Sequence, residues 1–235
     1  LGLGDLSDRR PSTVSTGQAQ RAALARALAT EPALLLLDEP LSALDPQTRS
    51  ATRADLHRRL GQFEGIAIVV THDPVDALTL ADRLVFLDAG RVVQVDTPAA
   101  AIARPRSPYV AGIVGLNLLS GTARVTERVV IDTAGVSVIT AEDPASVSHG
   151  QRLWLTIDPA AIALYDRPPE GSTRNIWPVT VHDVTVVGQR ARISLRGPLP
   201  LTAEVTTGAV ADLSLIAGRQ LYAGVKATEV ITYPA

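Results

Sequence analysis

Two acidic residues and a histidine follow apolar runs in the first part of the chain, where their side chains could act on a phosphate. Asp38 and Glu39 follow the run ALLLL (33–37), and His72 follows the run IAIVV (66–70). Ligands of α/β proteins bind at the carboxyl ends of parallel strands, so we expect these side chains to share one crevice. Asp38 could hold Mg²⁺, Glu39 could polarise an attacking water, and His72 could bind a terminal phosphate or orient that water. Each residue also fits a structural role, in a polar turn or as a satisfied histidine at a strand end.

A turn of small residues, VSTGQ (14–18), precedes a helix pattern and could hold an anion. Ser15 offers a hydroxyl, Gly17 permits a φ that other residues resist, and the helix presents free N–H groups. Taken alone, Ser15 is simply a helix cap. A nucleotide also needs a phosphate loop of the form G-x-x-x-x-G-K-[ST]. The sequence has one lysine, Lys226, and Ala227 follows it, so the printed chain contains no such loop.

The composition excludes several classes of protein. The formal net charge of −2 gives no broad electrostatic surface for nucleic acid, so we expect no nucleic-acid partner. The absence of cysteine excludes disulfides and thiolate metal sites, and it fits a reducing compartment. No apolar run approaches the roughly 18 residues that cross a bilayer, and no signal peptide is evident, so a membrane role must come through a partner. Because methionine is absent even at position 1, we expect a piece of a longer product.

Strands alternate with helices in the first half, which predicts an α/β layer with parallel pairing. The apolar runs are continuous and bounded by turn residues, the pattern of strands covered on both faces. Asp45 and Pro46 predict an N-cap and a first helical position. The predicted elements are a helix at 17–29, a strand at 33–37, a helix from Pro46 to about Leu60, a strand at 66–70, a helix at 74–80 and two strands within 83–95 around a turn at 88–90.

The texture changes after about residue 105, where short β-branched stretches alternate with Gly, Pro, Asp and Asn. Closely spaced short strands predict a small barrel or sandwich. We place the boundary near 112–116, which gives one domain at 1–112 and a β-rich domain at 116–235. The turn-rich segment DRPPEGSTRN (166–175) could separate two sub-barrels.

Four motifs of the first half, in this order and spacing, resemble the ATPase subunits of ABC transporters: VSTGQAQRAALARAL, LLLLDEP, SALD and VVTHD, between about Leu6 and Val95. The resemblance implies an incomplete P-loop NTPase-type α/β core that uses ATP and Mg²⁺. It also implies that Asp38 is the Walker B metal carboxylate, Glu39 the general base and His72 the switch histidine. The implied nucleotide-binding residues are the signature residues Ser15, Thr16, Gly17 and Gln18 and the D-loop Asp45.

The same resemblance implies a dimer, because the family's signature turn closes over ATP held by the opposite subunit. The phosphate loop and the glutamine loop would lie upstream of Leu1, so we expect this chain alone to be inactive. The family pattern is close to L-S-G-G-Q, and here Val14 and Thr16 replace the first Leu and the first Gly. We expect a negative φ at Thr16 and retained function.

The β-rich half resembles the accessory barrel of importer-type subunits, an OB-like fold. The segments EGSTRNIWPVTV and LYAGVKATEV resemble paired segments of molybdate-binding barrels. In that family an S-x-R-N turn and a lysine help to hold an oxyanion, sometimes across a subunit interface, which implies oxyanion-binding roles for Ser172, Arg174, Asn175 and Lys226. Arginine presents a planar fork to oxyanions and lysine a point charge. The alternative is that STRN is a turn and Lys226 a solvated charge.

The leading hypothesis is therefore an ATPase subunit of a molybdate importer, at the cytoplasmic face of the membrane beneath permease subunits. Sulfate, polyamine or sugar importers share the core and differ in the tail, so another cargo stays open. A rival from another class is a non-catalytic oxyanion-binding protein with the ATPase segment as a scaffold. A second rival, an ABC-type ATPase of translation or DNA repair, is disfavoured because the sequence shows neither a coiled-coil insertion nor a basic surface.

Overall fold

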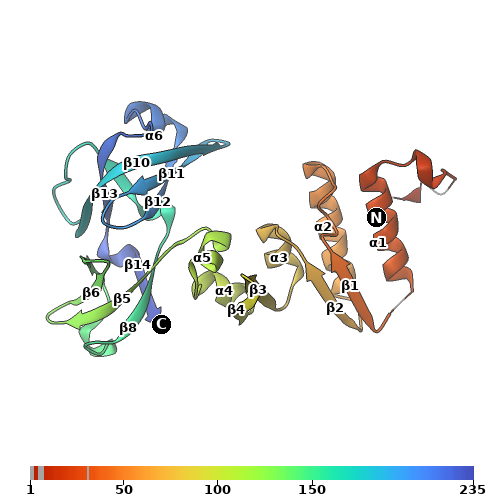
Figure 1. The fold of residues 1–235 in the computed structure, drawn as a ribbon, viewed down its shortest axis with the longest axis horizontal. Helices are drawn as coiled ribbons and strands as arrows, with labels where there is room; N and C mark the ends of the chain where they lie inside the picture. The colour runs from red at the N-terminus through yellow and green to blue at the C-terminus, as the bar shows by residue number, and fades with distance from the viewer. Residues whose placement is uncertain (1–2, 5–7, 31) are drawn as a thin grey trace. The chain divides into compact units, whose positions relative to one another are not determined.

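Two compact units make up the chain (Figure 1). The computed structural model describes residues 3–4, 8–30 and 32–235, so Leu6, at the start of the predicted ATPase segment, lies outside the described residues. One unit contains Leu1–Val85 with Val95–Ala99, and the other contains Phe86–Gln94 with Ala100–Ala235. None of the helices in the described ranges is long and apolar enough to span a bilayer.

The first unit is the predicted α/β layer. Strands β1 (Leu34–Asp38) and β2 (Ile66–Val70) pair in parallel, with Leu34 opposite Ile66 and Asp38 opposite Val70, which confirms the predicted pairing. Both strands therefore end at the same edge of the sheet. The helical elements of this unit are η2 (Pro11–Thr13), α1 (Thr16–Ala29), α2 (Pro46–Leu60) and α3 (Pro74–Leu80), close to the predicted bounds.

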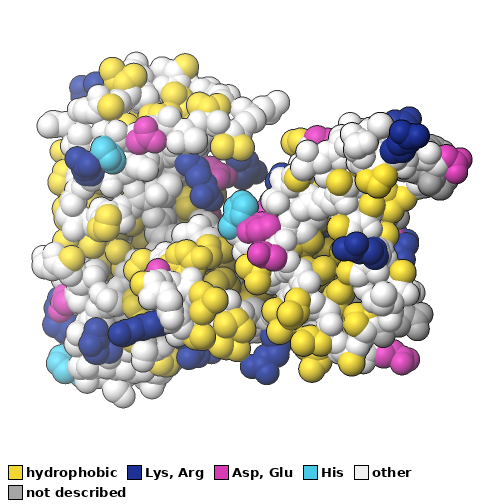
Figure 2. Space-filling model, turned by 45° about the vertical axis from the view of Figure 1, so that its right-hand side comes forward, with side chains coloured by type: hydrophobic (Ala, Val, Ile, Leu, Met, Phe, Trp, Pro, Cys, Tyr) yellow, Lys and Arg dark blue, Asp and Glu magenta, His cyan; other side chains and the backbone are white. Residues whose placement is uncertain are grey.

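Only one face of this sheet is covered. Leu35 and Leu37 of β1 are buried in a cluster with Leu24 of α1 and Leu56 of α2. On the other face Leu36 is 65% exposed. The prediction of two strands covered on both faces is wrong for this structure, because both long helices contribute to the cluster on a single face. Figure 2 shows many hydrophobic side chains at the molecular surface. The exposed large apolar residues of β1 and β2 are Leu34, Leu36, Ile66, Ile68 and Val70.

A hairpin and two short helices follow the α/β layer. Strands β3 (Leu84–Asp88) and β4 (Arg91–Asp96) confirm the two strands predicted within 83–95. Ala89 and Gly90 between them have φ values of 47° and 75°, which is the left-handed geometry that two-residue hairpin turns require. Helices α4 (Pro98–Ala103) and α5 (Pro108–Val114) lead into the β-rich part.

The compact units divide upstream of the predicted boundary at 112–116. The buried Gln94 explains part of the difference, because its amide donates to the carbonyl of Arg104 at 3.1 Å and accepts from the N–H of Arg106 at 2.8 Å. The Tyr233 hydroxyl donates to the carbonyl of Pro105 at 2.6 Å. The Gln94 bonds tie residues 104–106 to β4, and the Tyr233 bond ties Pro105 to the β-rich part. The boundary between sequence domains stays a prediction.

Two five-stranded sheets form the β-rich part, with orders β14-β8-β5-β6-β7 and β12-β11-β10-β13-β9. Every neighbouring pair described in them is antiparallel. The strands are β5 (Asn117–Val125), β6 (Val129–Thr133), β7 (Val136–Ile139), β8 (Arg152–Ile157), β9 (Ala163–Tyr165), β10 (Asn175–Val187), β11 (Arg190–Arg196), β12 (Leu201–Thr206), β13 (Gln220–Val225) and β14 (Val230–Pro234), and the helical elements are η3 (Pro144–Ser146), η4 (Pro159–Ala161), α6 (Thr207–Asp212) and η5 (Ala227–Glu229).

The two sheets are formed by two series of strands in the same order, and the last strand of each series pairs in the sheet of the other. The series β5-β6-β7-β8-η4-β9 has the same order as β10-β11-β12-β13-η5-β14. However, β9 pairs with β13 of the second series, and β14 pairs with β8 of the first. The sequences LWLTIDPAAIALY (153–165) and LYAGVKATEVITY (221–233) correspond position by position across these elements. The β-rich part is therefore an internal duplication.

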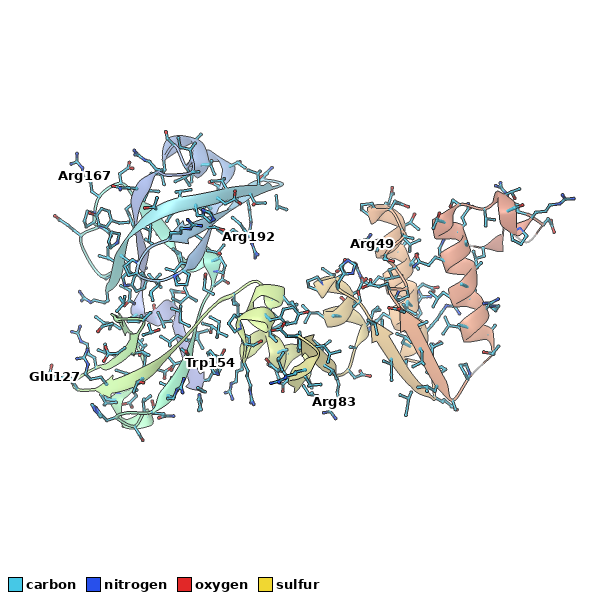
Figure 3. All side chains as sticks on the ribbon, in the orientation of Figure 1. Arg49, Arg83, Glu127, Trp154, Arg167 and Arg192 are labelled. Atoms are coloured by element: carbon cyan, nitrogen blue, oxygen red, sulfur yellow. The ribbon has the colours of Figure 1, made fainter. Side chains whose placement is uncertain are left out.

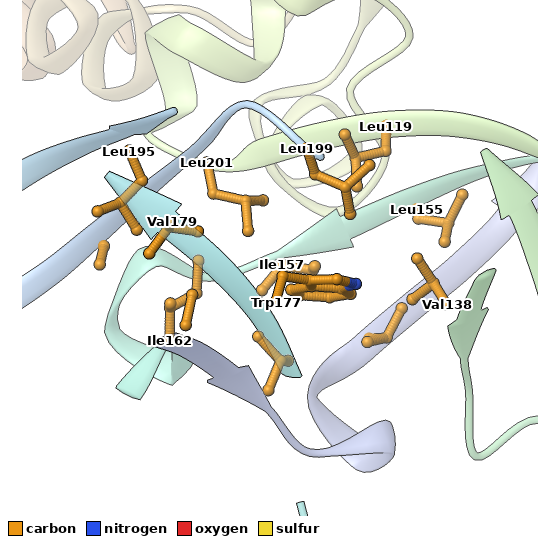
Figure 4. Close-up of a cluster of buried hydrophobic side chains, with 14 of the residues drawn as sticks. Leu119, Val138, Leu155, Ile157, Ile162, Trp177, Val179, Leu195, Leu199 and Leu201 are labelled. Carbon is orange, nitrogen blue, oxygen red and sulfur yellow. The ribbon is translucent and has the colours of Figure 1, made fainter. Parts of the chain in front are cut away.

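One core serves both sheets (Figure 4). Leu155 and Ile157 of the first sheet lie in the same buried cluster as Trp177, Val179 and Leu195 of the second. Residues 166–175 separate the two copies of the duplication along the chain, as predicted, but they do not separate two independent cores. The chain already passes from the first sheet to the second at η4, between β8 and β9, before that segment begins.

Candidate functional site

The end of β1 turns sharply at Glu39. Its φ of 47° is left-handed, and its N–H donates to the carbonyl of Val70 at 2.9 Å, at the end of β2. A left-handed φ is uncommon for a residue with a Cβ and is maintained only by surrounding contacts. Pro40 follows and is buried, whereas Asp38, the last residue of β1, is exposed. The turn therefore places two consecutive carboxylates at the edge of the sheet.

His72 lies against Glu39, as expected from the two strand ends. One carboxylate oxygen, Oε1, accepts the N–H of His72 at 3.0 Å and lies 2.6 Å from His72 Nδ1. The imidazole is 80% exposed and the Glu39 side chain is 32% exposed. The pair is thus open to a ligand and to water, and only one of the two carboxylate oxygens is bonded to the histidine.

A residue that the sequence did not single out, Gln20, supports this turn from α1. Its amide nitrogen donates to the carbonyl of Glu39 at 2.8 Å, and its amide oxygen accepts the N–H of Ala43 at 3.2 Å. The Ser42 hydroxyl donates to the same Glu39 carbonyl at 2.9 Å. The helix that follows the Ser15 turn is therefore fastened directly to the backbone of Glu39. The polar repeat Q-A-Q (18–20) in the first turns of the helix was the available signal.

The Ser15 turn has the geometry of a helix cap. The Ser15 hydroxyl accepts the N–H of Gln18 at 3.3 Å, and the Gln18 side chain accepts the N–H of Ser15 at 2.9 Å, a reciprocal capping box. Ser15 and Thr16 are both exposed, so the turn is accessible in this structure. Thr16 begins α1, and it is not among the described residues with positive φ, which agrees with the predicted negative φ.

Gly17 is required for a different reason from the one predicted. It lies within α1 and is not among the described glycines with positive φ, so it does not supply an unusual backbone conformation. Instead, a Cβ at this position would lie 3.0 Å from Leu44 Cδ2 and 3.4 Å from the carbonyl oxygen of Ala43. The glycine permits close packing of α1 on the segment between β1 and α2.

Asp45 caps α2, as predicted. Its carboxylate accepts the N–H of Thr48 at 3.0 Å, and Pro46 occupies the first helical position. Hydrogen bonds from the side chain and then the backbone of Thr48 lower the pKa of Asp45. Asp45 is exposed. It can therefore accept further hydrogen bonds from a ligand or a second molecule while it caps the helix.

Arg49 lies on α2 (Figure 3). Its side chain joins the segment between β1 and α2 to the residues after His72. It donates to the carbonyls of Ser42 at 3.2 Å and Leu44 at 3.1 Å, and it lies 3.5 Å from the carboxylate of Asp73. Arg53, one turn further along α2, pairs with the buried Asp76 of α3. This network, which sequence reasoning missed, orients the chain on both sides of the histidine.

The carboxylates suit an ion that keeps much of its water. Among the described residues, no group of three or more His, Asp or Glu side chains could hold a metal ion. Mg²⁺ is usually bound by one or two carboxylates, several waters and phosphate oxygens, and not by an all-protein cage. The exposed carboxylate of Asp38 fits such an ion.

Within one copy of the chain, the four residues predicted to bind an oxyanion do not line one cavity. Asn175 is 2% exposed, and its amide both accepts the N–H of Ile139 at 2.7 Å and donates to the carbonyl of Ile139 at 2.9 Å. Its side chain holds β7, so it is a structural clamp in this conformation. Asn117, at the corresponding position of β5, binds both the N–H and the carbonyl of Thr202 in the same way, at 2.6 Å and 2.9 Å.

The other three predicted residues are exposed but lie at different places. Lys226 lines a cavity of about 430 Å³ with Thr173 and Tyr165. Arg174 lines a second cavity, of about 280 Å³, together with Arg128. Ser172 is exposed and lines neither cavity. Within one chain Arg174 and Lys226 therefore line different cavities, and an oxyanion site that combines them across a subunit interface stays a prediction.

Comparison with known proteins matches both halves to families. The ABC transporter family model matches residues 1–42, and the TOBE domain model matches residues 171–232. The molybdenum import ATP-binding protein ModC of Mycobacterium tuberculosis is 35% identical over 97% of this chain and 63% of its own length. The molybdate/tungstate import ATP-binding protein WtpC of Pyrococcus horikoshii is 33% identical over 100% of this chain and 66% of its own length. The sulfate/thiosulfate import ATP-binding protein CysA 2 of Chromobacterium violaceum is 36% identical over 100% and 63%.

The chain thus spans less than two thirds of the length of these relatives. The matched regions nevertheless lie in both parts of the chain. The match to the ABC transporter family comes first and the match to the TOBE domain follows it. The chain is therefore similar over both of its parts to the ATP-binding subunits of ABC transporters.

Proposed function

We propose that the whole protein is the ATP-hydrolysing subunit of an ABC importer and that molybdate is its cargo. The observation that carries the catalytic part is the Glu39 carboxylate, which is held by two contacts from His72 at the common edge of β1 and β2. A scaffold has no need of a carboxylate held in a left-handed turn beside an exposed histidine. The relatives named for molybdenum and for molybdate or tungstate import support the cargo.

Each residue at the strand ends has a distinct task in this proposal. Glu39 accepts a proton from the attacking water through its oxygen that is not bonded to His72, a contribution of about 10²- to 10⁴-fold for a positioned base. His72 fixes the other oxygen and presents its exposed ring to the terminal phosphate of ATP. Asp38 would hold Mg²⁺, which neutralises phosphate charge when bound.

The signature turn serves a second subunit. Ser15 and Thr16 are exposed, and they are joined through α1 and Gln20 to the backbone of Glu39. We infer a homodimer in which Ser15, Thr16, Gly17 and Gln18, with Asp45, contact ATP held mainly by the partner subunit. The phosphate loop that this requires is not in the printed chain, so the chain supplies one side of a composite site. Its partners would be permease subunits, at the cytoplasmic face of the membrane.

The catalytic proposal is tested with the full-length natural protein that contains this chain. The wild type should bind and hydrolyse ATP with Mg²⁺, and Glu39→Gln should retain ATP binding while hydrolysis falls at least about 100-fold. Glu64→Gln, an exposed residue before β2, is the matched control and should hydrolyse normally. A wild-type product that binds no ATP would overturn the proposal in favour of the non-catalytic oxyanion-binding alternative.

The cargo requires a separate test, since the sulfate/thiosulfate relative is as similar as the molybdenum relative. The 235-residue chain should be titrated calorimetrically with molybdate, tungstate and sulfate. Molybdate should give heat of binding at low millimolar concentration or below. Lys226→Gln and Arg174→Gln should each be measured, because the two cations line different cavities. Heat with sulfate alone would indicate a sulfate importer, and no heat with any anion would remove the oxyanion assignment.

A further inference from the structure

The duplicated segments of the β-rich part carry opposite charges at one position. In the alignment of 153–165 with 221–233, Asp158 corresponds to Lys226. Each residue directly follows a buried strand and directly precedes a short helical turn and an exchanged strand. The Asp158 carboxylate accepts the N–H of Ala160 at 2.8 Å, whereas Lys226 makes no side-chain bond of this kind. The duplication has therefore kept the backbone and inverted the charge.

Both charged residues line the same cavity. Besides Asp158 and Lys226, the lining of this 430 Å³ cavity includes Glu229, Tyr165 and Thr173. Its charged groups are thus two carboxylates and one ammonium, and the side chains of Tyr165 and Thr173 add neutral hydroxyls. Asp158, Lys226 and Glu229 are all exposed, so their charges are solvated and available to a bound ion.

We propose that Asp158 sets the affinity of this cavity for oxyanions by opposing the attraction of Lys226. This inference rests on the proposed function, in which Lys226 contacts an oxyanion. A fully ionised oxyanion has only hydrogen-bond acceptors, so it cannot bond to a carboxylate and is repelled by it. A unit charge several ångströms from a dianion in a partly solvated cavity changes the binding constant on the order of tenfold or more. Asp158 thereby keeps the cavity empty until the anion is abundant.

The test is calorimetric titration of the complete chain with sodium molybdate and sodium sulfate at low ionic strength. Asp158→Asn keeps an oxygen that can accept the Ala160 N–H, so the local turn is preserved. The affinity for molybdate should rise about tenfold in Asp158→Asn and further in Asp158→Lys, and added salt should reduce both gains. The matched control is Asp166→Asn, an exposed carboxylate outside the cavity lining, which should bind like the wild type.

The outcomes separate this inference from the proposed function. If the wild type binds molybdate and both Asp158 variants bind with unchanged affinity, Asp158 has no such role, while the oxyanion site survives. If neither the wild type nor either variant binds any oxyanion, both the site and the role of Asp158 are overturned. If only the variants bind, the carboxylate blocks the cavity as inferred. Should Asp158→Asn fail to fold by circular dichroism, Asp158→Ser, which also retains a capping oxygen, takes its place.

Discussion

The two parts of the molecule protect their apolar surface very differently. In the α/β part, one face of a two-stranded sheet packs on helices while Leu36 and Ile68 on the other face are 65% and 50% exposed. In the β-rich part, two sheets enclose a single core, and exchanged strands link the two copies of the duplicated segment. Among the described residues, six buried side chains make the first cluster and twenty-four the second, so the second part should be much the more stable.

The difference also affects how functional side chains are held. Around Glu39, single side chains such as Gln20 and Arg49 bond to backbone atoms of exposed turns. In the β-rich part, Asn117 and Asn175 bond to backbone atoms inside a packed core. Turns of the first kind open at a lower free-energy cost than side chains packed in a core. Buried side chains such as Asn117 and Asn175 hold the strands that they join in one conformation.

Truncation of the largest core side chain should show the strongest contrast. Trp177→Ala should destabilise the β-rich part by about 3–5 kcal/mol, because a large cavity forms between two sheets that cannot collapse onto it. Calorimetric unfolding should show the higher-temperature transition shifted downward and the transition of the α/β part unchanged. Val187→Ala, at a position 68% exposed, is the control and should change stability by less than about 0.5 kcal/mol. Equal shifts of both transitions would show that the two parts unfold as one.

Loss of either buried asparagine, Asn117 or Asn175, should lower the free energy of unfolding nearly as much as the tryptophan truncation. The two losses should be equal. Asn175→Ala leaves the N–H and carbonyl of Ile139 unsatisfied, at a cost of about 2–3 kcal/mol, and Asn117→Ala does the same at Thr202. Chemical denaturation should report both losses in the same transition. Gln189→Ala, an exposed amide in the turn between β10 and β11, should have little effect. If only one of the two variants lost much stability, the two asparagines would not have equivalent roles in the two copies.

Much of the first part was predictable because its signals are local. A proline after Asp45, two continuous apolar runs and a D-A-G turn specify elements within a few residues, and the structure has them at the predicted places. The opening of one sheet face was not predictable, because an apolar run shows that a strand can be buried but not what covers it. The support of Glu39 by Gln20 was equally hidden, because it joins residues nineteen positions apart on different elements.

The β-rich part was predictable in class but not in topology. Short strands with turn residues between them indicate antiparallel sheets, yet nothing local shows that β9 and β14 exchange places. The resemblance to molybdate-binding barrels assigned Asn175 to a ligand, whereas tertiary packing buries it against Ile139 in this structure. Buried polar residues with a backbone partner far along the chain escape pattern analysis for this reason.

Removal of Gln20 should have a smaller and local effect. Gln20→Ala deletes the bonds to Glu39 and Ala43, and we expect a local loss of about 1–2 kcal/mol. Amide hydrogen exchange of residues 39–43 should become about tenfold faster, while the β-rich part exchanges as before. Gln47→Ala, an exposed glutamine of α2, is the matched control. Unchanged exchange at 39–43 would mean that Ser42 and Val70 hold the turn without help from α1.

The smallest expected effect is the loss of stability on replacing a tyrosine by phenylalanine. It should differ between Tyr165 and Tyr233, which occupy corresponding positions in the two copies. Burial raises the pKa of Tyr233 to about 12, and its hydroxyl donates to the carbonyl of Pro105. The folded state therefore favours the protonated phenol, so its contribution to stability is complete below the unfolded pKa of about 10 and is lost as the pH rises from there toward 12. Tyr233→Phe should cost about 1 kcal/mol at pH 8 and should reduce the loss of stability between pH 9 and pH 11, measured by urea denaturation. Tyr165→Phe, at the corresponding position of the first copy, should leave that alkaline loss in place. If Tyr165→Phe reduces it equally, the bond to Pro105 does not set the two copies apart, and the alkaline sensitivity belongs to the duplicated fold itself.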